Sequence, residues 1–522
     1  MHLIDTLAGW LGYRKEHRGS ISFVPARGKR DFAAALQTRL TNDWNTTITS
    51  ADAELKGAIK PMRSRCRDLE RNNDYARRYL KLLDNNVLGS TGIGLQMKIR
   101  EWVKSEGKMV QQYDTRANQM IEDGWYKWSR RQFCTVTKTL NLRDVQGLVL
   151  RTVARDGACL VRKHYPADNP FHFALEPIEP DQLDTDFSTT NEAGNVVRLG
   201  VEYDKMQRVV AYHILKQHPG EIYQQRVGGL YRERISANQF FHVFCPERIG
   251  QSTGAPWMVS AATGLRNVDK YCEAEVVAAR VSAAKMGFLV PSPNSPNPGY
   301  TGPSDSQGNK YMEVEPGSVE MLPFGYDFKA FDPTHPNSAF GDFVKSQLRG
   351  IAAGLNVSYN SLANDLESVN YSSIRAGLLD EREEWKRIQN WFVDWFLNPV
   401  FEEWLNYALM SGAITDGSLT LPASKFEKFN SPEWKPRRWD WVDPLKDQQA
   451  NVLAVEKGFK SRRSIIAESG GDIEDTFADI AADEALAEEY DLDFDESQEA
   501  AMDAQETPDE PDSVDKEEKT DA

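Results

Sequence analysis

Helical and strand-like periods of hydrophobic residues follow one another in a clear order over the first 255 residues. Apolar positions recur with helical spacing over residues 50–84, 115–128 and 141–156. Pro61 lies inside the first stretch and predicts an interruption there, because proline lacks the N–H that a helix interior needs. Alternating or β-branched runs predict strands at 93–99, 159–164, 172–176, 197–203, 209–215 and 240–244. Helices mixed with short strands indicate an α+β fold.

Long helical stripes replace the short strands after residue 255. A helix of about 30 residues opens at 255–257 and would extend roughly 45 Å. Residues 291–336 then hold nine of the 25 prolines and cannot be helical. They are either a flexible linker or a small β-rich insert, with candidate strands at 310–314 and 318–322. A second amphipathic helix is predicted over 337–355.

A polar loop and a long, interrupted helix follow. Residues 358–370 contain no Lys or Arg, and the helix predicted over 371–398 has an apolar face that Glu381 breaks. Pro399 predicts a kink before the helix continues to about Met410. The aromatic stripe of this helix is typical of core packing rather than of a cofactor site. Short strands near 419 and 439–442, and helices over 443–489 with a break at 458–459, complete the pattern.

Charge is distributed unevenly between the body of the chain and its C-terminus. The chain has a formal net charge of −16, but residues 471–522 hold 22 acidic and two basic residues, against 56 acidic and 60 basic in the rest. The end of this segment, 491–522, is nearly free of aromatic residues and is predicted to be a disordered tail. The tail is either a solubilising segment or a docking element. The body lacks the basic surplus of a tight DNA binder, so it either does not meet nucleic acid or meets it without holding it.

Composition also disfavours several classes of protein. No uninterrupted apolar run approaches the length of a transmembrane helix, so no membrane partner is expected. Residues 1–14 include Asp5 and lack a basic start, which argues against a signal peptide. The cysteines contain no Cys-x-x-Cys pair and are expected to be reduced thiols in a cytosolic context. They are Cys66, Cys134, Cys159, Cys245 and Cys272.

Three short motifs match functional signatures but lack the surrounding structure that those signatures need. Residues 250–254, Gly-Gln-Ser-Thr-Gly, fit the nucleophile elbow of serine hydrolases, but 245–249 separate them from the preceding strand. Residues 89–94 contain three glycines, but their spacing does not supply the last glycine of the G-x-G-x-x-G dinucleotide-binding fingerprint. Residues 491–495 lack the glycine and glutamate of a calcium loop. We therefore expect no metal, no cofactor and no catalysis, with a hydrolase using Ser252 kept as an alternative.

Several segments, in their order along the chain, give a more specific indication. The longest is Ser358-Tyr-Asn-Ser-Leu-Ala-Asn-Asp-Leu-Glu-Ser-Val-Asn-Tyr-Ser-Ser-Ile-Arg-Ala-Gly-Leu-Leu379. The others are Arg67-Asp-Leu-Glu-Arg-Asn-Asn73, Asn85-Asn-Val-Leu-Gly89, Gly250-Gln-Ser-Thr-Gly-Ala-Pro256, Trp441-Val-Asp-Pro-Leu-Lys446 and Gly458-Phe-Lys-Ser461. Over about residues 50–490 the chain resembles the portal proteins of tailed bacteriophages, specifically the lambda-like portal family. The longest segment is similar to the loop that enters the tunnel helix in that family.

The resemblance implies a portal-type architecture with named parts. These are an N-terminal segment (1–48), a wing (49–255), a first stem helix (256–288), a β-rich clip (289–336), a second stem helix (337–357), a tunnel loop (358–371), a kinked tunnel helix (372–412), strands returning to the wing (413–445), a helical crown (446–490) and the acidic tail (491–522).

The resemblance also implies a function and partners. Family members form a ring, usually of twelve subunits, at one capsid vertex, and conduct double-stranded DNA during packaging and ejection. Their partners are the terminase large subunit, the major capsid protein or scaffold, and later the head-completion and tail proteins. The location implied is the virion, with the host cytoplasm during assembly. The alternative is a cytosolic scaffold that binds basic partners through its acidic tail.

A ring repeats each residue around its bore, so a single charge becomes a belt of charge. The only charged residues of the predicted tunnel loop are Asp365 and Glu367, which would repel phosphates or let them slide past. Basic residues of the stem would give sparse positive rings, or would instead form salt bridges between subunits, for example between Asp342 and Lys345. The candidate channel residues are Asn360, Asn364, Asp365, Glu367, Lys345, Arg349, Arg266, Lys270 and Arg280.

Overall fold

The computed structural model describes most of the chain between residues 42 and 489. The described ranges are 42–105, 108–221, 231–284, 287–291, 326–330, 339–367, 371–439, 444–468 and 473–489, with residues 13, 14, 24, 25, 39, 303, 304 and 306. The expected acidic tail and most of the expected clip, including its candidate strands at 310–314 and 318–322, lie outside these ranges.

The N-terminal part begins with two consecutive helices, α2 (Ala51–Asn72) and α3 (Asp74–Leu83). The predicted interruption of the first helix at Pro61 is wrong, because α2 runs through that residue. Ile59 and Arg63 flank the proline and are buried. Packing of this face against the body therefore outweighs the hydrogen bond that proline removes.

Further helices follow along the chain. A π-helical turn, η2 (Asp84–Leu88), continues α3 and is followed by α4 (Thr115–Trp128), α5 (Arg131–Cys134) and α6 (Leu142–Asp156). The start of α6 at Asn141 is confirmed by a capping box. The Asn141 side chain accepts a hydrogen bond from the Asp144 amide at 2.8 Å, and the Asp144 carboxylate accepts one from the Asn141 amide at 3.2 Å.

The named strands of the described residues pair only in antiparallel fashion. One sheet has the order β13-β6-β7, and a larger one has the order β12-β11-β10-β9-β8. The bounds are β6 (Ala158–His164), β7 (Ala174–Ile178), β8 (Thr189–Thr190), β9 (Val196–Arg198), β10 (Val201–Tyr203), β11 (Val209–Leu215), β12 (Arg232–Ser236) and β13 (Phe240–Phe244). Short 3₁₀ turns, η3 (Pro180–Gln182) and η4 (Ala237–Gln239), lie between them.

The single strand predicted over 197–203 is wrong, because the chain reverses inside that run. Leu199 and Gly200 have φ angles of +48° and +80°, and they join β9 to β10 as a hairpin. Glycine adopts such angles without strain, and a two-residue turn of this kind matches the twist of the strands. The alternating pattern therefore spans two antiparallel strands rather than one.

Three small strand pairs complete the body. They are β16 (Pro432–Lys435) with β3 (Gly94–Met97), β4 (Arg100–Ser105) with β5 (Lys108–Tyr113), and β1 (Tyr13–Arg14) with β2 (Val24–Pro25). The first pair brings the C-terminal part back to the N-terminal part. The strand predicted near Leu419 is wrong, because Leu419 lies between the bridged residues Thr415 and Thr420. Of the strand predicted over 439–442 only Trp439 is described, and it has no regular structure. Residues 440–443 lie outside the described ranges.

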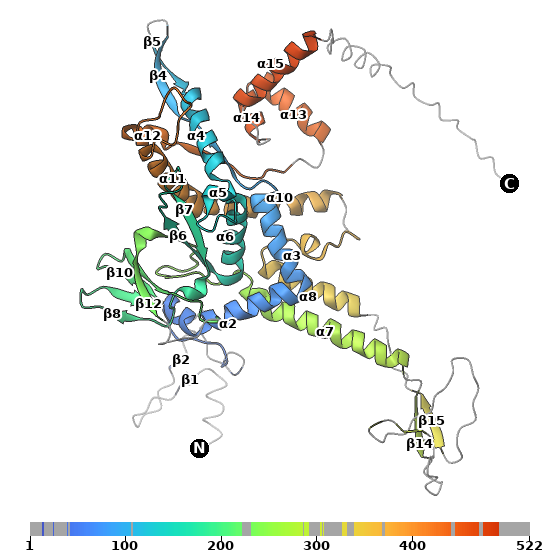
Figure 1. The fold of residues 1–522 in the computed structure, drawn as a ribbon. Helices are drawn as coiled ribbons and strands as arrows, with labels where there is room; N and C mark the ends of the chain where they lie inside the picture. The colour runs from blue at the N-terminus through green and yellow to red at the C-terminus, as the bar shows by residue number, and fades with distance from the viewer. Residues whose placement is uncertain are drawn as a thin grey trace, which may run out of the picture.

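Two helices extend away from this body. The first, α7 (Val259–Ala284), leads into a strand pair formed by β14 (Gly287–Pro291) and β15 (Tyr326–Ala330). The second, α8 (Phe340–Gly354), returns beside α7 toward the body, and a short helix, α9 (Tyr359–Ala363), follows it. Figure 1 shows α7 and α8 side by side, with β14 and β15 beyond the far end of α7.

The predicted long helix near the C-terminus is present, and a π-helical stretch lies just before Pro399. The helix consists of α10 (Tyr371–Phe392), a π-helical stretch η5 (Val393–Leu397) and α11 (Asn398–Met410). The amide of Asn398 bonds the carbonyl of Val393, so the wider turn is completed just before the proline. The helical path therefore restarts at Pro399, which lies in the first turn of α11, where its missing N–H costs least.

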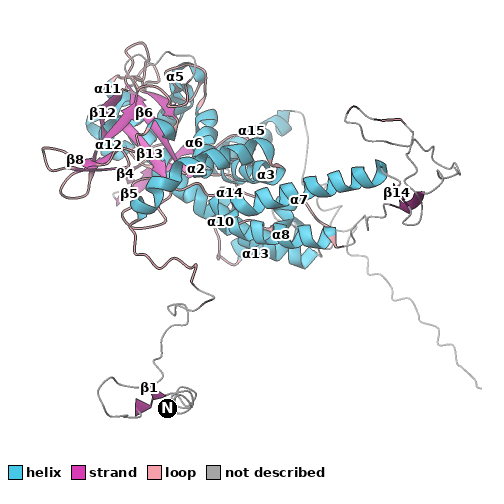
Figure 2. Cartoon of the chain, turned by 90° about the horizontal axis from the view of Figure 1, so that it is seen from below, coloured by secondary structure: helices cyan, strands magenta, loops and turns pink. Residues whose placement is uncertain are grey.

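The main core lies where α4, α10 and α11 meet the three-stranded sheet. Trp125, Trp128 and Trp404 are fully buried, and the Trp125 ring lies 5.1 Å from that of Trp404 at 79°. Of the aromatic stripe, Trp385, Phe392 and Trp404 are buried and Trp395 is 36% exposed, so most of the stripe packs in the core, as predicted. Beyond α11 come η6 (Ala423–Lys425), α12 (Phe426–Phe429), and then α13 (Pro444–Glu456), α14 (Arg462–Glu468) and α15 (Ile473–Glu489). Figure 2 shows the larger sheets gathered at one end, with the long helices extending from them.

Candidate nucleic-acid interface

The α7–α8 pair is held closely where it leaves the body. The Gly264 position on α7 faces Ile351 of α8 so closely that an added Cβ would lie 3.0 Å from its Cγ1 atom. The Ser260 hydroxyl donates a hydrogen bond to the Gly354 carbonyl at 2.8 Å. Leu265 of α7 is fully buried in this contact region. The first half of α7 is thus fixed to the body and to α8.

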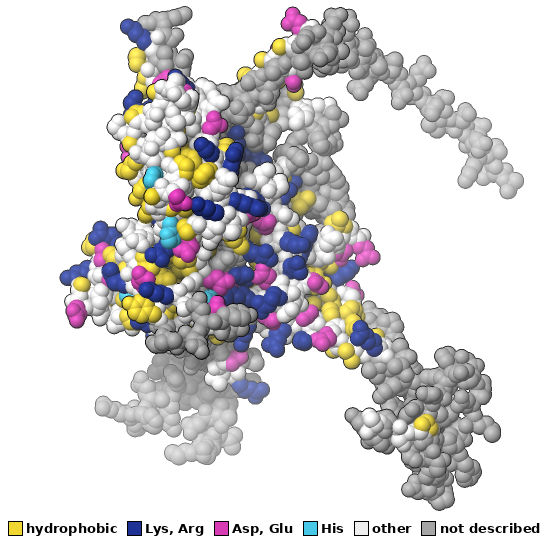
Figure 3. Space-filling view, in the orientation of Figure 1, with side chains coloured by type: hydrophobic (Ala, Val, Ile, Leu, Met, Phe, Trp, Pro, Cys, Tyr) yellow, Lys and Arg dark blue, Asp and Glu magenta, His cyan; other side chains and the backbone are white. Residues whose placement is uncertain are grey.

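The second half of α7 extends beyond α8. Tyr271 is stacked on Phe340 at the first residue of α8, with ring centroids 5.7 Å apart, so α8 covers α7 only to about this point. Val276 and Val277, further along, are 51% and 50% exposed. Figure 3 shows hydrophobic side chains at the surface where α7 and α8 leave the body. The apolar residues Leu265 and Val268 in the first half of α7 are therefore covered, whereas Val276 and Ala279 in the second half are bare.

The loop after α8 is held on the body by hydrogen bonds from two helices. The hydroxyls of Ser358 and Ser361 lie 2.9 and 2.8 Å from Glu381 Oε2 of α10. The Arg78 guanidinium of α3 donates to the Ser361 carbonyl at 3.2 Å. Glu381 is 7% exposed, so the residue that breaks the apolar face of α10 is the buried acceptor that holds the loop.

The two acidic residues of the loop both pair with one lysine of α8. Lys345 Nζ lies 3.2 Å from Glu367 Oε2 and 3.5 Å from Asp365 Oδ2. The hydrogen bond with Glu367 and the charge of Asp365 raise the pKa of Lys345. The Tyr359 hydroxyl donates to Asp365 at 2.7 Å and is the main cause of the lowered pKa of that carboxyl. Lys345, Asp365 and Glu367 form a cluster that we call the loop triad.

The loop triad changes the prediction in one respect. Within one chain, Lys345 pairs with Asp365 and Glu367. The Arg349 guanidinium lies 5.5 Å from the centre of the Tyr359 ring, so a second positive charge adjoins the triad. With two basic and two acidic side chains, the surface of the loop is close to neutral rather than acidic.

The remaining predicted residues lie apart from the triad. Asn360 is half-buried within α9, and Asn364 is exposed and ends α9 with a left-handed backbone. Lys270 pairs with Glu273 of its own helix at 2.6 Å, whereas Arg266 and Arg280 are exposed on α7. The structure thus brings together Lys345, Arg349, Asp365 and Glu367, and it leaves the basic residues of α7 as a separate group.

Sequence reasoning missed the residues that position the loop. Arg78 falls in a predicted helix and Tyr359 in the predicted polar loop, and no periodicity singles them out. Glu381 did carry a signal, because a charged residue inside an apolar stripe needs a buried partner. Two serines 20 and 23 positions earlier in the chain supply that partner.

Ser252, the candidate hydrolase nucleophile, is buried and hydrogen-bonded to an aspartate of α2. Its hydroxyl donates to Asp52 Oδ2 at 2.6 Å, and its amide donates to Asp52 Oδ1 at 2.8 Å. The residue is 1% exposed, and among the described residues no histidine is hydrogen-bonded to it. Gly254 approaches Gly157 so closely that an added Cβ would lie 2.0 Å from the Gly157 carbonyl oxygen. Ser252 and Gly254 therefore have packing roles, and Gly250 has a positive φ angle of +80°.

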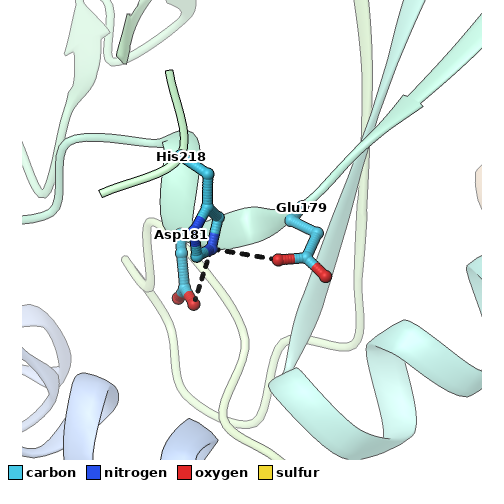
Figure 4. Close-up of side chains that lie close together, drawn as sticks. All are labelled: Glu179, Asp181 and His218. Atoms are coloured by element: carbon cyan, nitrogen blue, oxygen red, sulfur yellow. Dashed lines mark ion pairs between the residues drawn. The ribbon is translucent and has the colours of Figure 1, made fainter. Parts of the chain in front are cut away.

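One group of side chains has the composition of a metal site. Glu179, Asp181 and His218 point toward one another (Figure 4), and His218 Nε2 lies 3.0 Å from Glu179 Oε2 and 3.6 Å from Asp181 Oδ2. However, Arg67 Nη1 lies 2.5 Å from Asp181 Oδ2 and Arg63 Nη1 lies 3.2 Å from Oδ1. Burial opposes ionisation of Asp181, but these guanidinium groups lower its pKa overall. The carboxylate is committed to two arginines, so the group fits an ion-pair network better than a metal.

In the part of the chain that the structure describes, no helix combines the length and the hydropathy that a membrane span requires.

Comparisons with known proteins give a consistent result. The model of the family described as "Phage portal protein, lambda family" matches residues 37–389. The chain is 35% identical over 460 residues to a "Probable portal protein" of Halomonas phage phiHAP-1, covering 87% of this chain and 86% of that protein. It is 23% identical to the portal protein of Escherichia phage N15, covering 83% and 86%. A solved structure of the neck of an empty gene transfer agent particle covers 78% of this chain and 93% of its own, at 15% identity and a TM-score of 0.41.

Proposed function

The chain belongs to the lambda family of phage portal proteins, and we propose that its copies close into a ring around double-stranded DNA at one vertex of the capsid. The ring serves as the channel for DNA during packaging and ejection. It also serves as the docking platform for the terminase large subunit and later for head-completion and tail proteins. The protein performs this work by shape and charge rather than by catalysis.

The observation that carries this proposal is the bare second half of α7. From Ala274 to Ala284 only Glu275 and Arg280 carry charge. Val276 and Val277 are consecutive, so on a helix they point about 100° apart, toward two different sides. A helix that is apolar on two sides needs cover from two directions. A closed ring supplies it, because each subunit contacts one neighbour on each side through different surfaces.

The parts expected from the family are assigned to this chain as proposals. α7 and α8 form the stem (256–288 and 337–357), and the segment between them (289–336), whose described strands are β14 and β15, forms the clip. The loop at 358–371 faces the bore, followed by the kinked helix at 372–412. Residues 49–255 and 413–445 form the wing, and 446–490 the crown. We assign the contacts with the terminase and the connector proteins to the clip, because β14 and β15 lie at the far end of α7.

The loop triad supports a channel that does not hold its DNA. A belt of unpaired lysines would bind phosphates and stall the duplex, since each neutralised phosphate adds affinity. Lys345 is paired with both Asp365 and Glu367, and Arg349 adjoins them, so the loop offers DNA little net charge. We propose that this lack of net charge lets DNA pass the loop with little friction.

A DNA-packaging assay with charge variants tests the channel proposal. The double variant Asp365→Lys with Glu367→Lys replaces the paired carboxylates by a positive belt, and we expect rings that form normally but package DNA poorly. Adding Lys345→Glu restores ion pairs of opposite polarity and is expected to recover part of the packaging. Wild-type packaging by the double variant in intact rings would contradict the role of loop charge.

A further inference from the structure

A second feature of the surface has the composition of a binding site, and it includes the glycine motif of residues 89–94. A cavity of about 650 Å³ lies between the turn after η2 and the chain around β16. Its lining contains two basic residues and no carboxylate. The lining residues are Asn85, Leu88, Gly89, Ser90, Thr91, Gly92, Gly94, Tyr126, Lys435, Pro436 and Arg437.

The turn at the base of this cavity is held rigidly from beneath. Gln146 is 2% exposed, and its amide group accepts from the Ile93 N–H at 2.9 Å and donates to the Ile93 carbonyl at 3.2 Å. Gly92 has a φ angle of +82°, and a Cβ added there would lie 2.8 Å from both Arg143 and Gln146. Only glycine fits this position. The shape of the turn is therefore fixed before any ligand arrives.

The positive charge of the cavity is not cancelled by its surroundings. The nearby carboxylate of Asp84 is already paired, because Arg143 Nη2 lies 3.1 Å from both of its oxygens and 2.7 Å from the Gly89 carbonyl. Lys435 lies opposite Gly94 in the β16–β3 pair, where the absence of a side chain leaves space beside it. No described carboxylate forms an ion pair with Lys435 or Arg437. The cavity therefore carries net positive charge.

Arg437 is fixed in direction as well as in charge. Its Nη1 atom donates to the Asn85 carbonyl and lies 3.3 Å from Asn86 Oδ1, and its side-chain carbons lie against Gly89. Gln389 of α10 donates to the Arg437 carbonyl at 2.9 Å and to the Asn86 carbonyl at 3.0 Å. These contacts hold the arginine at the edge of the glycine turn. Its side chain therefore loses little further conformational entropy when a ligand binds.

We propose that this cavity binds a phosphate group. Ser90 and Thr91 are exposed at its rim and add hydroxyl donors to the two cations. A phosphate presents more acceptor oxygens than a carboxylate, so it makes fuller use of hydroxyl, amide and cationic donors around a glycine turn. The group comes either from inorganic phosphate or a phosphate monoester in solution, or from the backbone of DNA. The lining of the cavity shares no residue with α7, α8 or the loop triad.

Binding of radiolabelled inorganic phosphate to the purified full-length protein, by equilibrium dialysis in a phosphate-free buffer, tests the proposal. Lys435→Gln is expected to weaken binding by about tenfold, because a charge-assisted contact is lost. The double variant Ser90→Ala with Thr91→Val keeps the charge and is expected to weaken it by about fivefold. Lys56→Gln removes an exposed lysine of α2 outside the cavity and serves as the matched control, with unchanged binding.

A short DNA duplex added as a competitor identifies the source of the phosphate. If the duplex displaces inorganic phosphate from the wild type but not from Lys435→Gln, the site binds the DNA backbone. If the duplex displaces no phosphate from the wild type, the site binds free phosphate. Absence of phosphate binding overturns the proposal, and so does equal binding by the wild type and both cavity variants with unchanged melting temperatures. Ring formation is scored separately in the same samples, so a failure of this site is distinct from a failure of the channel proposal.

Discussion

The two halves of α7 belong to one helix but have opposite surroundings. In the first half, Leu265 and Val268 are 0% and 4% exposed, because α8 and the body cover them. In the second half, Val276 and Val277 are about half exposed, although the residues around them are even less polar. One helix thus belongs partly to the fold of the chain and partly to an interface. Fold stability and assembly are therefore expected to respond to different residues of the same helix.

The largest effect is expected from a charge in the bare half. In the double variant Val276→Asp with Val277→Asp, carboxylates would be buried between subunits without partners, and the desolvation cost would prevent ring formation. Because these side chains are exposed in the single chain, its melting temperature is expected to change little. Size-exclusion chromatography with light scattering and a thermal melt measure the two effects. Val136→Asp, at a valine that is 42% exposed in the body, is the control.

A deletion in the covered half is expected to act on the fold instead. Leu265→Ala leaves a cavity between α7, α8 and the body, with an expected loss of about 2–5 kcal/mol in the free energy of unfolding. Rings are still expected below the lowered melting temperature, because the interface is untouched. Chemical denaturation of the protein measures the loss. If Leu265→Ala abolished rings while leaving the unfolding free energy unchanged, the division of α7 into two halves would be wrong.

The hydrogen bonds that hold the loop after α8 on the body are expected to give an effect of intermediate size. Glu381→Ala removes the buried acceptor of Ser358 and Ser361 and is expected to cost about 1–3 kcal/mol, because both hydroxyls lose their partner. Unlike Leu265→Ala, it is expected to raise amide hydrogen exchange mainly over 358–367. Glu383→Ala, at an exposed residue of the same helix, is the control. Uniform exchange across α7 and α8 would show that Glu381 supports the fold rather than the loop.

The smallest effect concerns pH and the loop triad. The pKa of Asp365 is lowered in the folded protein, mainly by the Tyr359 hydroxyl, from an ordinary value of 3.8. A lowered pKa means that the contribution of the carboxylate is fully present above 3.8 and is lost as pH falls through the lowered value. Exchange at 364–367, corrected for its intrinsic rate, should therefore rise at acidic pH. In Lys345→Gln this rise should begin at a higher pH.

Much of the fold could be predicted from the sequence, because periodicity reports local burial. The bounds of α4 and the cap of α6 agree closely with the pattern, and the order of helices around the proline-rich segment is confirmed. The errors have a common physical cause. At Pro61 and at the Leu199–Gly200 turn, contacts distant in sequence or a two-residue reversal override the local preference.

The candidate interface was only partly predictable. Asp365 and Glu367 were identified as the charges of the loop, but their pairing with Lys345 could not be read from the sequence, because 20 and 22 residues separate the partners. The phosphate cavity was hidden for the same reason. Its glycine turn and Lys435 lie more than 300 residues apart and meet only through the pairing of β16 with β3.

The central claim, that the bare half of α7 is an interface between copies in a closed ring, is tested most directly by the mass of the purified full-length protein. Mass photometry over a range of concentrations and salt conditions measures it. The account predicts a dominant species near twelve times the 59.1 kDa of the chain, converted to single chains by Val276→Asp with Val277→Asp. A species of 59.1 kDa under every condition would contradict it.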